Sequence, residues 1–138
     1  MPQLDAHHEA VKAALTKDGW RVTHDPFTIK LPDLKLYVDL AAEKVYQDDH
    51  QPRKVAIEIK VFGGLSFINE FEKAVGQYLI YRQFLEELFP ERTLYLAVSA
   101  QAFEGSFQQP SIRAIVAKQQ IKLLVFNADT EEILQWIE

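Results

Sequence analysis

The amino-acid sequence predicts a single mixed α/β domain, and three observations lead to this fold class. The chain of 138 residues fits one domain and leaves little room for two, because domains most often contain about 100–150 residues. Apolar and polar residues alternate with a period of two in the first half, whereas a later segment carries apolar residues at helical spacing. The predicted order is a helix, several antiparallel strands, a long helix, a strand, a helix and a strand, which is typical of a mixed α/β domain.

Helices are predicted where apolar residues recur at helical spacing. The first spans about residues 4–17 and stops at an Asp-Gly pair. The longest spans residues 67–89, where Ser66 is a suitable N-cap and Pro90 ends the helix. A short helix is predicted over residues 110–118, with its apolar residues on one side.

Strands are predicted from alternation and from short apolar runs. Residues 35–41 and 54–61 are expected to form a hairpin across a polar loop at 47–53, each strand having one core face and one mixed face. Two shorter segments, 20–22 and 27–31, are separated by an Asp-Pro turn and are expected to pair with each other. Further strands are predicted at residues 93–99 and 122–126, and residues 133–137 are a last strand or a turn of helix.

Three charged residues of the predicted hairpin form the strongest candidate site: Asp39, Glu58 and Lys60. Glu58 and Lys60 are two residues apart in one strand, so they project from the same face, roughly 6.6 Å from each other along the strand. If the hairpin turn centres on residues 48 and 49, Asp39 lies opposite Glu58, with the Cβ atoms within ~5 Å. The rule that each strand buries its apolar residues also places both carboxylates on one face.

This arrangement of acids and lysine suits phosphate chemistry. Two carboxylates as close as Asp39 and Glu58 repel each other, so one takes up a proton unless a cation neutralises them. Mg²⁺ resolves the conflict, because it prefers one or two carboxylates together with waters and phosphate oxygens. Such an ion lowers the pKa of a bound water and stabilises charge on a phosphate, and Lys60 could orient or activate that water. The set therefore predicts metal-assisted phosphodiester hydrolysis.

The same residues also allow a structural interpretation. Asp39, Glu58 and Lys60 could form a cross-strand charge cluster on a solvated face of the sheet. A second acid-x-lysine match, Asp33-Leu34-Lys35, is set aside because it follows a proline and has no partner acid on an adjacent strand. On the long helix a polar stripe either lines a cleft beside the strands or faces bulk water; its members are Glu70, Lys73, Gln77 and Tyr81.

The histidines and a glycine pair are weaker candidates. His7, His8 and His24 show no spacing suited to metal ligands, and His50 falls in the polar turn, where solvation is the simplest interpretation. The Gly63-Gly64 pair is either a tight strand-to-helix turn or a phosphate-binding loop.

Composition argues against several classes of protein. The net charge of −5 argues against non-specific coating of nucleic acid, although it allows a local basic groove. A chain without cysteine has neither a disulfide framework nor a thiolate zinc site, and we expect it in the cytoplasm. Its apolar runs are shorter than the ~20 residues that a membrane span needs, and its first residues lack a signal-peptide pattern, so no membrane association is expected.

The candidate site resembles that of one nuclease superfamily, and longer stretches resemble one family. Asp39, Glu58-x-Lys60 and the Gln77…Tyr81 helix look like those of the PD-(D/E)XK nuclease superfamily. More closely, the chain resembles the XisH family over nearly its whole length. The stretches that carry this resemblance are His8-Glu9-Ala10-Val11-Lys12, Lys17-Asp18-Gly19-Trp20, Tyr37-Val38-Asp39-Leu40-Ala41-Ala42-Glu43-Lys44, Ile57-Glu58-Ile59-Lys60 and Lys73-Ala74-Val75-Gly76-Gln77-Tyr78, with two later ones at 94–98 and 121–126.

The resemblance carries expectations about fold and function. It implies a restriction-endonuclease-like α/β core, with a mixed sheet flanked by helices in one domain over residues 1–138. The family is named for an excision controlling factor of the fdxN element, which implies an Mg²⁺-dependent DNA endonuclease-like factor in site-specific excision or rearrangement. The alternative is a non-catalytic regulatory or partner-binding protein that retains the nuclease fold, so whether the chain is an enzyme stays open. Implied partners are DNA, an XisI-like protein and a site-specific recombinase, and a homodimer is compatible with the resemblance.

The resemblance also assigns roles to residues of the candidate site. Asp39 and Glu58 would hold Mg²⁺ or Mn²⁺, and Lys60 would serve the attacking water. Gln77 matches a helix glutamine of related nucleases. Glu9 matches an acidic position on the first helix that some superfamily members use as an extra metal ligand.

Overall fold

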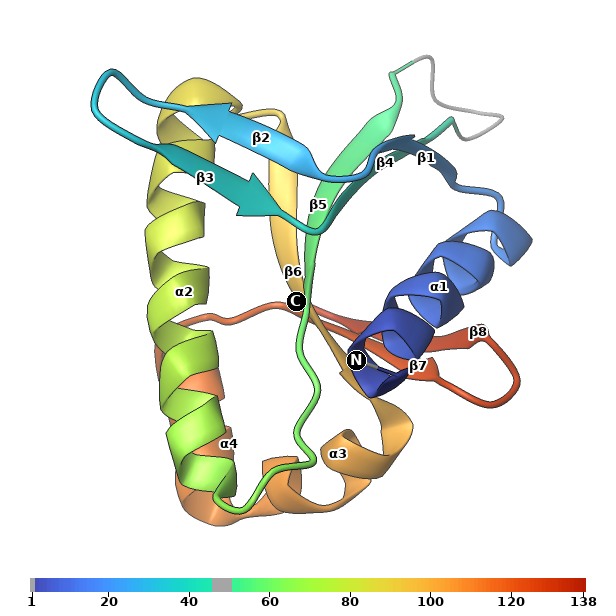
Figure 1. Ribbon diagram of the computed structural model, residues 1–138, viewed down its shortest axis with the longest axis vertical. Helices are drawn as coiled ribbons and strands as arrows, with labels where there is room; N and C mark the ends of the chain where they lie inside the picture. Colours follow the sequence, from blue (N-terminus) through green and yellow to red (C-terminus); the bar gives the residue numbers. More distant parts are fainter. Residues whose placement is uncertain (1, 46–50) are drawn as a thin grey trace.

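The computed structural model describes residues 2–45 and 51–138 of the chain (Figure 1). The elements follow in this order: α1 (Pro2–Lys17), β1 (Arg21–His24), β2 (Phe27–Lys30), β3 (Lys35–Val38), β4 (Leu40–Lys44), β5 (Arg53–Ile59), α2 (Phe67–Leu88), β6 (Arg92–Ser99), α3 (Ala100–Glu104), the 3-10 helix η1 (Ser106–Gln108), α4 (Pro110–Lys118), β7 (Leu123–Asn127) and β8 (Glu132–Ile137).

Six strands form one mixed sheet in the order β1-β4-β5-β6-β7-β8, while β2 and β3 form a separate two-stranded ribbon. The central strands β5, β6 and β7 are parallel, and the pairs β1–β4, β4–β5 and β7–β8 are antiparallel. Parallel neighbours need crossover connections, which α2 supplies between β5 and β6 and α3–α4 supply between β6 and β7. The predicted α/β fold, a mixed sheet flanked by helices, is confirmed at this level.

Helices cover both faces of the sheet, with α1 and α2 on opposite sides (Figure 1). Val11 of α1 packs in one core cluster with Ile57, and Tyr78 of α2 packs in the other with Ala56. Strand β5 is therefore buried on both faces over residues 55–59. The prediction of one core face and one mixed face is wrong for this strand, because α2 covers the face that the alternation leaves mixed, on which Ala56 lies.

The first strands pair differently from the prediction. β1 pairs with β4 and β2 with β3, so the expected pairing between residues 20–22 and 27–31 is wrong. The predicted strand 35–41 is divided at Asp39 into β3 and β4. Val38 packs in the core beside α2, whereas Leu40 packs in the core beside α1. Residues two apart in one strand would share a face, so the break at Asp39 moves the chain from one side of the sheet to the other.

The other predicted elements agree closely with the structure. The three predicted helices occur as α1, α2 and α4, and Ser66 caps α2 by accepting a hydrogen bond from the N–H of Asn69 at 3.3 Å. Residues 133–137 belong to a strand, β8, and the short helices α3 and η1 are additional. Most of the predicted polar loop, residues 47–50, lies outside the described residues. Among the helices described, none has both the length and the apolar character needed to cross a bilayer.

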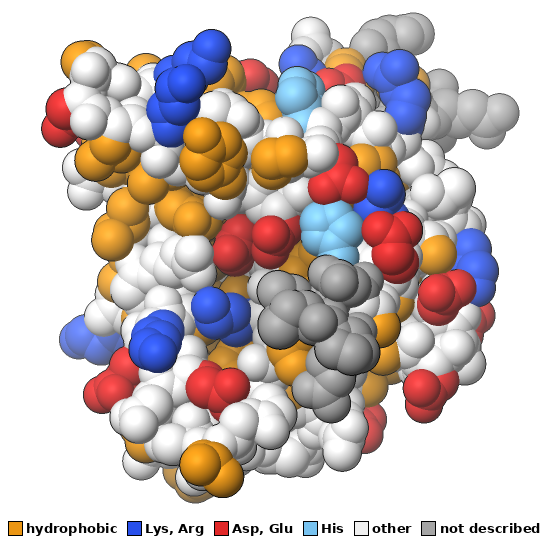
Figure 2. All heavy atoms as spheres, viewed as in Figure 1, with side chains coloured by type: hydrophobic (Ala, Val, Ile, Leu, Met, Phe, Trp, Pro, Cys, Tyr) orange, Lys and Arg blue, Asp and Glu red, His pale blue; other side chains and the backbone are white. Residues whose placement is uncertain are grey.

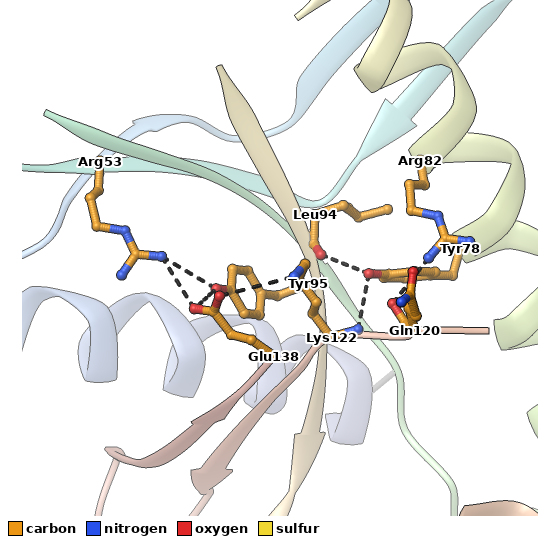
Figure 3. A network of polar contacts seen from close by, with 8 residues as sticks. All are labelled: Arg53, Tyr78, Arg82, Leu94, Tyr95, Gln120, Lys122 and Glu138. Carbon is orange, nitrogen blue, oxygen red and sulfur yellow. Dashed lines mark hydrogen bonds and ion pairs between the residues drawn. The ribbon is translucent and has the colours of Figure 1, made fainter. Parts of the chain in front are cut away.

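A buried tyrosine fixes α2 against the sheet (Figure 3). The hydroxyl of Tyr78 donates to the carbonyl of Leu94 in β6 at 2.8 Å and accepts from the N–H of Lys122 at 3.1 Å. Burial raises the pKa of Tyr78, so the hydroxyl stays neutral and keeps its donor. Because Tyr78 directly follows Gln77, this anchor also sets the direction in which residue 77 projects.

A second polar network joins β5, β6 and the residue after β8 (Figure 3). The hydroxyl of Tyr95 donates to Glu138 Oε2 at 2.6 Å, and Arg53 lies 3.4 Å from the same oxygen. Burial and the bond to the Glu138 carboxylate both raise the pKa of Tyr95. This network holds three strands of the sheet together away from the candidate site.

Helix α4 ends on a residue in the left-handed region. Gln120 has a φ of 53°, and the N–H of Ile121 closes the helix end on the carbonyl of Val116 at 3.0 Å. A residue with a Cβ costs roughly 1–2 kcal/mol there, whereas glycine has no such penalty. We therefore expect Gln120→Gly to raise the free energy of unfolding by about 0.5–1 kcal/mol, after the extra entropy of the unfolded chain is counted. Urea denaturation measures this change.

The preceding residue provides the control for this substitution. Gln119 has an ordinary helical φ of −82°, so Gln119→Gly should lower the free energy of unfolding. Equal effects of the two glycines would contradict the account of Gln120.

Candidate active site

The β4–β5 hairpin brings the two predicted acids together. The pair Leu40↔Ile57 confirms the predicted register, and the next position outward sets Asp39 opposite Glu58. The strand break frees the N–H of Asp39 from the ladder, and this group donates to Glu58 Oε1 at 3.2 Å. In return the N–H of Ile59 donates to Asp39 Oδ2 at 2.8 Å. Each carboxylate is thus fixed by a backbone donor from the neighbourhood of the other.

Glu58 is a buried acid beside a second acid. It is 7% exposed, whereas Asp39 is half-buried. Burial and the negative charge of Asp39 together raise the pKa of Glu58 to about 8, while the N–H of Asp39 and the charge of Lys60 act in the opposite direction. Without a cation, the pair therefore keeps a proton at neutral pH. A cluster on a solvated sheet face, the alternative interpretation, does not fit this burial.

The predicted lysine and glutamine are joined by a direct contact. Lys60 follows β5, and its backbone N–H donates to the carbonyl of Ala97 at 3.1 Å, which ties this residue to β6. Its Nζ donates to Gln77 Oε1 on α2 at 3.3 Å, and Gln77 Nε2 donates to the hydroxyl of Tyr81 at 2.9 Å. The two bonds fix the amide so that its oxygen faces the lysine.

Tyr81 takes part in the site more closely than its place in the polar stripe indicates. Burial raises the pKa of Tyr81, and the charges of Glu58 and Asp39 also raise it, whereas the hydrogen bond from Gln77 lowers it. The hydroxyl therefore lies within electrostatic reach of both acids. The signal in the sequence is the four-residue spacing from Gln77, which places both residues on one face of α2.

The predicted stripe divides along α2. Gln77 contacts Lys60 and Tyr81 lies within electrostatic reach of the acids, whereas Glu70 near the helix start accepts from the N–H of Gly64 at 3.2 Å. Lys73 is exposed. The prediction that the stripe lines the site therefore holds for its second half. The Gly63-Gly64 segment is joined to the helix by the Glu70 bond, which favours the strand-to-helix turn.

Glu9 is not brought together with the two acids. It is an exposed residue of α1, and among residues 2–45 and 51–138 no group of three or more His, Asp or Glu side chains is placed to hold a metal ion. Its role as an extra ligand stays a prediction. Asp39 and Glu58 alone still fit Mg²⁺ or Mn²⁺, because each uses one oxygen for its backbone bond and keeps a second.

His8 and His24 make surface and packing contacts. His8 Nε2 lies 2.8 Å from Asp25 Oδ1, and Lys12 Nζ lies 2.9 Å from the other oxygen of Asp25, so these residues join α1 to the β1–β2 turn. The His24 ring packs edge-on against Phe27. His50 lies outside the described residues.

Fold and site together define an α/β protein with paired carboxylates and a lysine at its central hairpin. Residues 1–134 match the family described as XisH protein, and the chain belongs to the XisH family. The predicted family is thereby confirmed.

Two solved structures are similar to this one over almost their full length. An XisH family protein from Nostoc punctiforme PCC 73102 has 39% sequence identity and a TM-score of 0.88, covering 97% of this chain and 100% of that one. A fdxN element excision controlling factor protein from Anabaena variabilis has 40% identity and a TM-score of 0.87, covering 97% and 99% of the two chains. No curated protein matches the chain.

The raised pKa of Glu58 predicts how stability depends on pH. Between pH 4.5 and about 8 the folded protein binds a proton that the unfolded chain releases, so stability falls as pH rises through this range. Glu58→Gln removes this titration. In EDTA we expect the variant to exceed wild type by roughly 2–4 kcal/mol at pH 8, with the difference shrinking towards pH 5, as measured by urea denaturation.

Glu132→Gln is the matched control, because Glu132 is an exposed strand residue. Its difference from wild type should be the same at both pH values. A Glu58→Gln difference that does not change with pH would show that Glu58 titrates normally.

Proposed function

We propose that this chain is a metal-dependent endonuclease-like factor of the PD-(D/E)XK type that acts on DNA during excision of a genetic element. The observation that carries the proposal is the buried Glu58 facing Asp39, with Lys60 held beside them by Gln77. A protein gains nothing in stability from two adjacent carboxylates of which one is buried. Binding of a cation accounts for two carboxylates placed side by side in this way.

The residues of such a site have different roles in the reaction. Asp39 and Glu58 would hold Mg²⁺ or Mn²⁺ through the oxygens that their backbone bonds leave. When bound, the cation lowers the pKa of a coordinated water and neutralises charge on the phosphate. Lys60 orients the attacking water or stabilises the developing negative charge, and Gln77 positions the ammonium group. Tyr81 is a positioning residue, because it fixes the amide of Gln77.

The similar structures support the DNA role. The Anabaena variabilis protein, 40% identical, is described as a fdxN element excision controlling factor, and it has the same fold at a TM-score of 0.87. We extend excision control to this chain on that likeness, together with the restriction-endonuclease-like assignment of its sheet. DNA, an XisI-like protein and a site-specific recombinase are the partners this proposal expects, and self-association is compatible with it.

A second candidate function is a regulatory protein that keeps the nuclease fold without cleaving. The net charge of −5 favours it, because an autonomous DNA-binding protein usually presents a strongly basic face. In that case the acidic pair would bind a cation or a proton for structure alone. Cleavage separates the two candidates.

The cleavage test uses supercoiled plasmid with Mg²⁺ or Mn²⁺. Wild type should nick the plasmid, and Glu58→Gln should reduce the rate by at least about 100-fold, since loss of one ligand disrupts the cation site. Glu132→Gln, the same chemical change at an exposed strand position, should nick like wild type. Equal nicking by Glu58→Gln and wild type would remove Glu58 from the catalytic assignment. Absence of metal-dependent nicking in all three would favour the regulatory candidate.

Thermal unfolding tests cation binding without any cleavage. In EDTA, Asp39→Asn should melt above wild type, because it removes the charge that opposes ionisation of Glu58. Mn²⁺ should raise the melting temperature of wild type, by the equivalent of about 2.7 kcal/mol at 100 times the dissociation constant, and leave the variant unchanged. A variant that melts below wild type in EDTA would mean that the two carboxylates do not crowd each other.

A further inference from the structure

The two-stranded ribbon β2–β3 has one buried face and one outward face. Its register pairs Phe27 with Val38, Thr28 with Tyr37, Ile29 with Leu36 and Lys30 with Lys35. Alternation then assigns the paired residues to faces. The face turned to the α2 side of the core carries Phe27, Ile29, Leu36 and Val38, and the outward face carries Thr28, Lys30, Lys35 and Tyr37.

The outward face contains a cross-strand pair of like charges. Lys30 and Lys35 lie directly opposite each other, both exposed, at the end of the ribbon where the N–H of Leu31 closes the turn on the carbonyl of Leu34 at 2.8 Å. Like charges at opposed positions destabilise a strand pair. No ion pair found in the described part of the chain involves either lysine, and Asp33 in the turn does not pair with them. The fold itself therefore gains nothing from this pair.

The chemistry of this face suits the phosphates of a nucleic-acid backbone. Two ammonium groups close together attract an anion with more than one charge, and the neighbouring hydroxyls of Tyr37, which is 54% exposed, and Thr28 can donate to phosphate oxygens. Lys, Thr and Tyr side chains are common phosphate ligands in protein–DNA complexes. In a chain with a net charge of −5, a local face without an acid of its own is where a polyanion can approach.

The ribbon is attached directly to the candidate active site. β3 ends at Val38, which is buried, and the next residue is Asp39. Phe27 and Ile29 are buried as well, so the inner face anchors the ribbon to the core. Figure 2 shows basic side chains in blue over the ribbon, an acidic side chain near its outer end, and further acidic side chains nearer the centre of the same face of the molecule. A backbone held on the ribbon would therefore lie close to the acids.

We infer that the outward face of the β2–β3 ribbon, formed by Thr28, Lys30, Lys35 and Tyr37, binds the phosphate backbone of a duplex and holds it over Asp39 and Glu58. This inference rests on the proposed function for the identity of the duplex as DNA. It adds a substrate-binding surface that is separate from the residues of the acidic site.

The test measures binding in EDTA, so it is independent of cleavage. A fluorescent 24-base-pair DNA duplex is titrated with wild type and with the double variant Lys30→Gln/Lys35→Gln, and affinity is followed by anisotropy between 50 and 200 mM salt. Loss of two phosphate contacts should weaken binding on the order of 60-fold at 0.1 M salt and reduce the slope of log K against log salt by about 2. The melting temperature of the double variant should not fall, because a repulsive pair has been removed.

The control variant is Arg113→Gln/Lys118→Gln on α4, which removes the same charge from two exposed residues. It should bind within about twofold of wild type. Unchanged affinity and salt slope in the ribbon variant, or an equal loss in the control variant, would overturn the inference, as would absence of any duplex binding by wild type at 50 mM salt.

An RNA duplex of the same sequence distinguishes the two sources of phosphate. Tighter binding of RNA, with the same dependence on Lys30 and Lys35, would support the ribbon as the phosphate-binding surface and would count against DNA in the proposed function. Binding that depends on the ribbon without any metal-dependent nicking would support the inference and leave the regulatory candidate. The two proposals can therefore fail separately.

Discussion

A buried acid next to a second acid is the constraint on which the rest of this molecule depends. Glu58 occupies a position in β5 where both faces of the sheet are covered, so its charge can be balanced only by groups that the protein brings to it. The backbone supplies the N–H of Asp39, and the end of the strand supplies Lys60. The negative charge that these groups leave uncompensated is neutralised by a proton or by a bound cation. The break between β3 and β4 and the placement of α2 both position groups around Glu58.

Helix α2 combines an anchor and a working face within a single turn. Tyr78 fastens the helix to β6 and to the backbone of Lys122, while its neighbour Gln77 contacts Lys60 and Tyr81. The anchoring bonds involve backbone groups of the sheet, whose positions are fixed by strand pairing. The orientation of the Gln77 amide therefore depends on the sheet rather than on the flexibility of the helix surface. This explains how one helix can position a side chain at an active site accurately.

Much of the site could be predicted from local pattern, because strand alternation and hairpin register are local properties. The pairing of positions 39 and 58 followed from the symmetry of the turn, and the contact of Lys60 with Gln77 is consistent with the predicted polar stripe. The predictions that failed concern strand pairing and helix packing, which local pattern does not determine. β1 pairs with β4 rather than with its neighbour in sequence, which leaves β2 to pair with β3, and the burial of both faces of β5 depends on α1 and α2 docking on opposite sides of it. The opposition of Lys30 and Lys35 emerges only once β2 and β3 are known to pair.

The chain passes from one side of the sheet to the other at Asp39, and this crossing fixes the number of residues between the ribbon and the main sheet. Val38 and Leu40 belong to different core clusters, so a residue inserted or deleted next to Asp39 would turn either the ribbon or β4 over by half a rotation. Apolar side chains would then face water and the lysines would face the core. The turn at residues 31–34, in contrast, can change length without altering either face. The junction at Asp39 therefore tolerates neither insertion nor deletion, whereas the turn at the tip of the ribbon tolerates both.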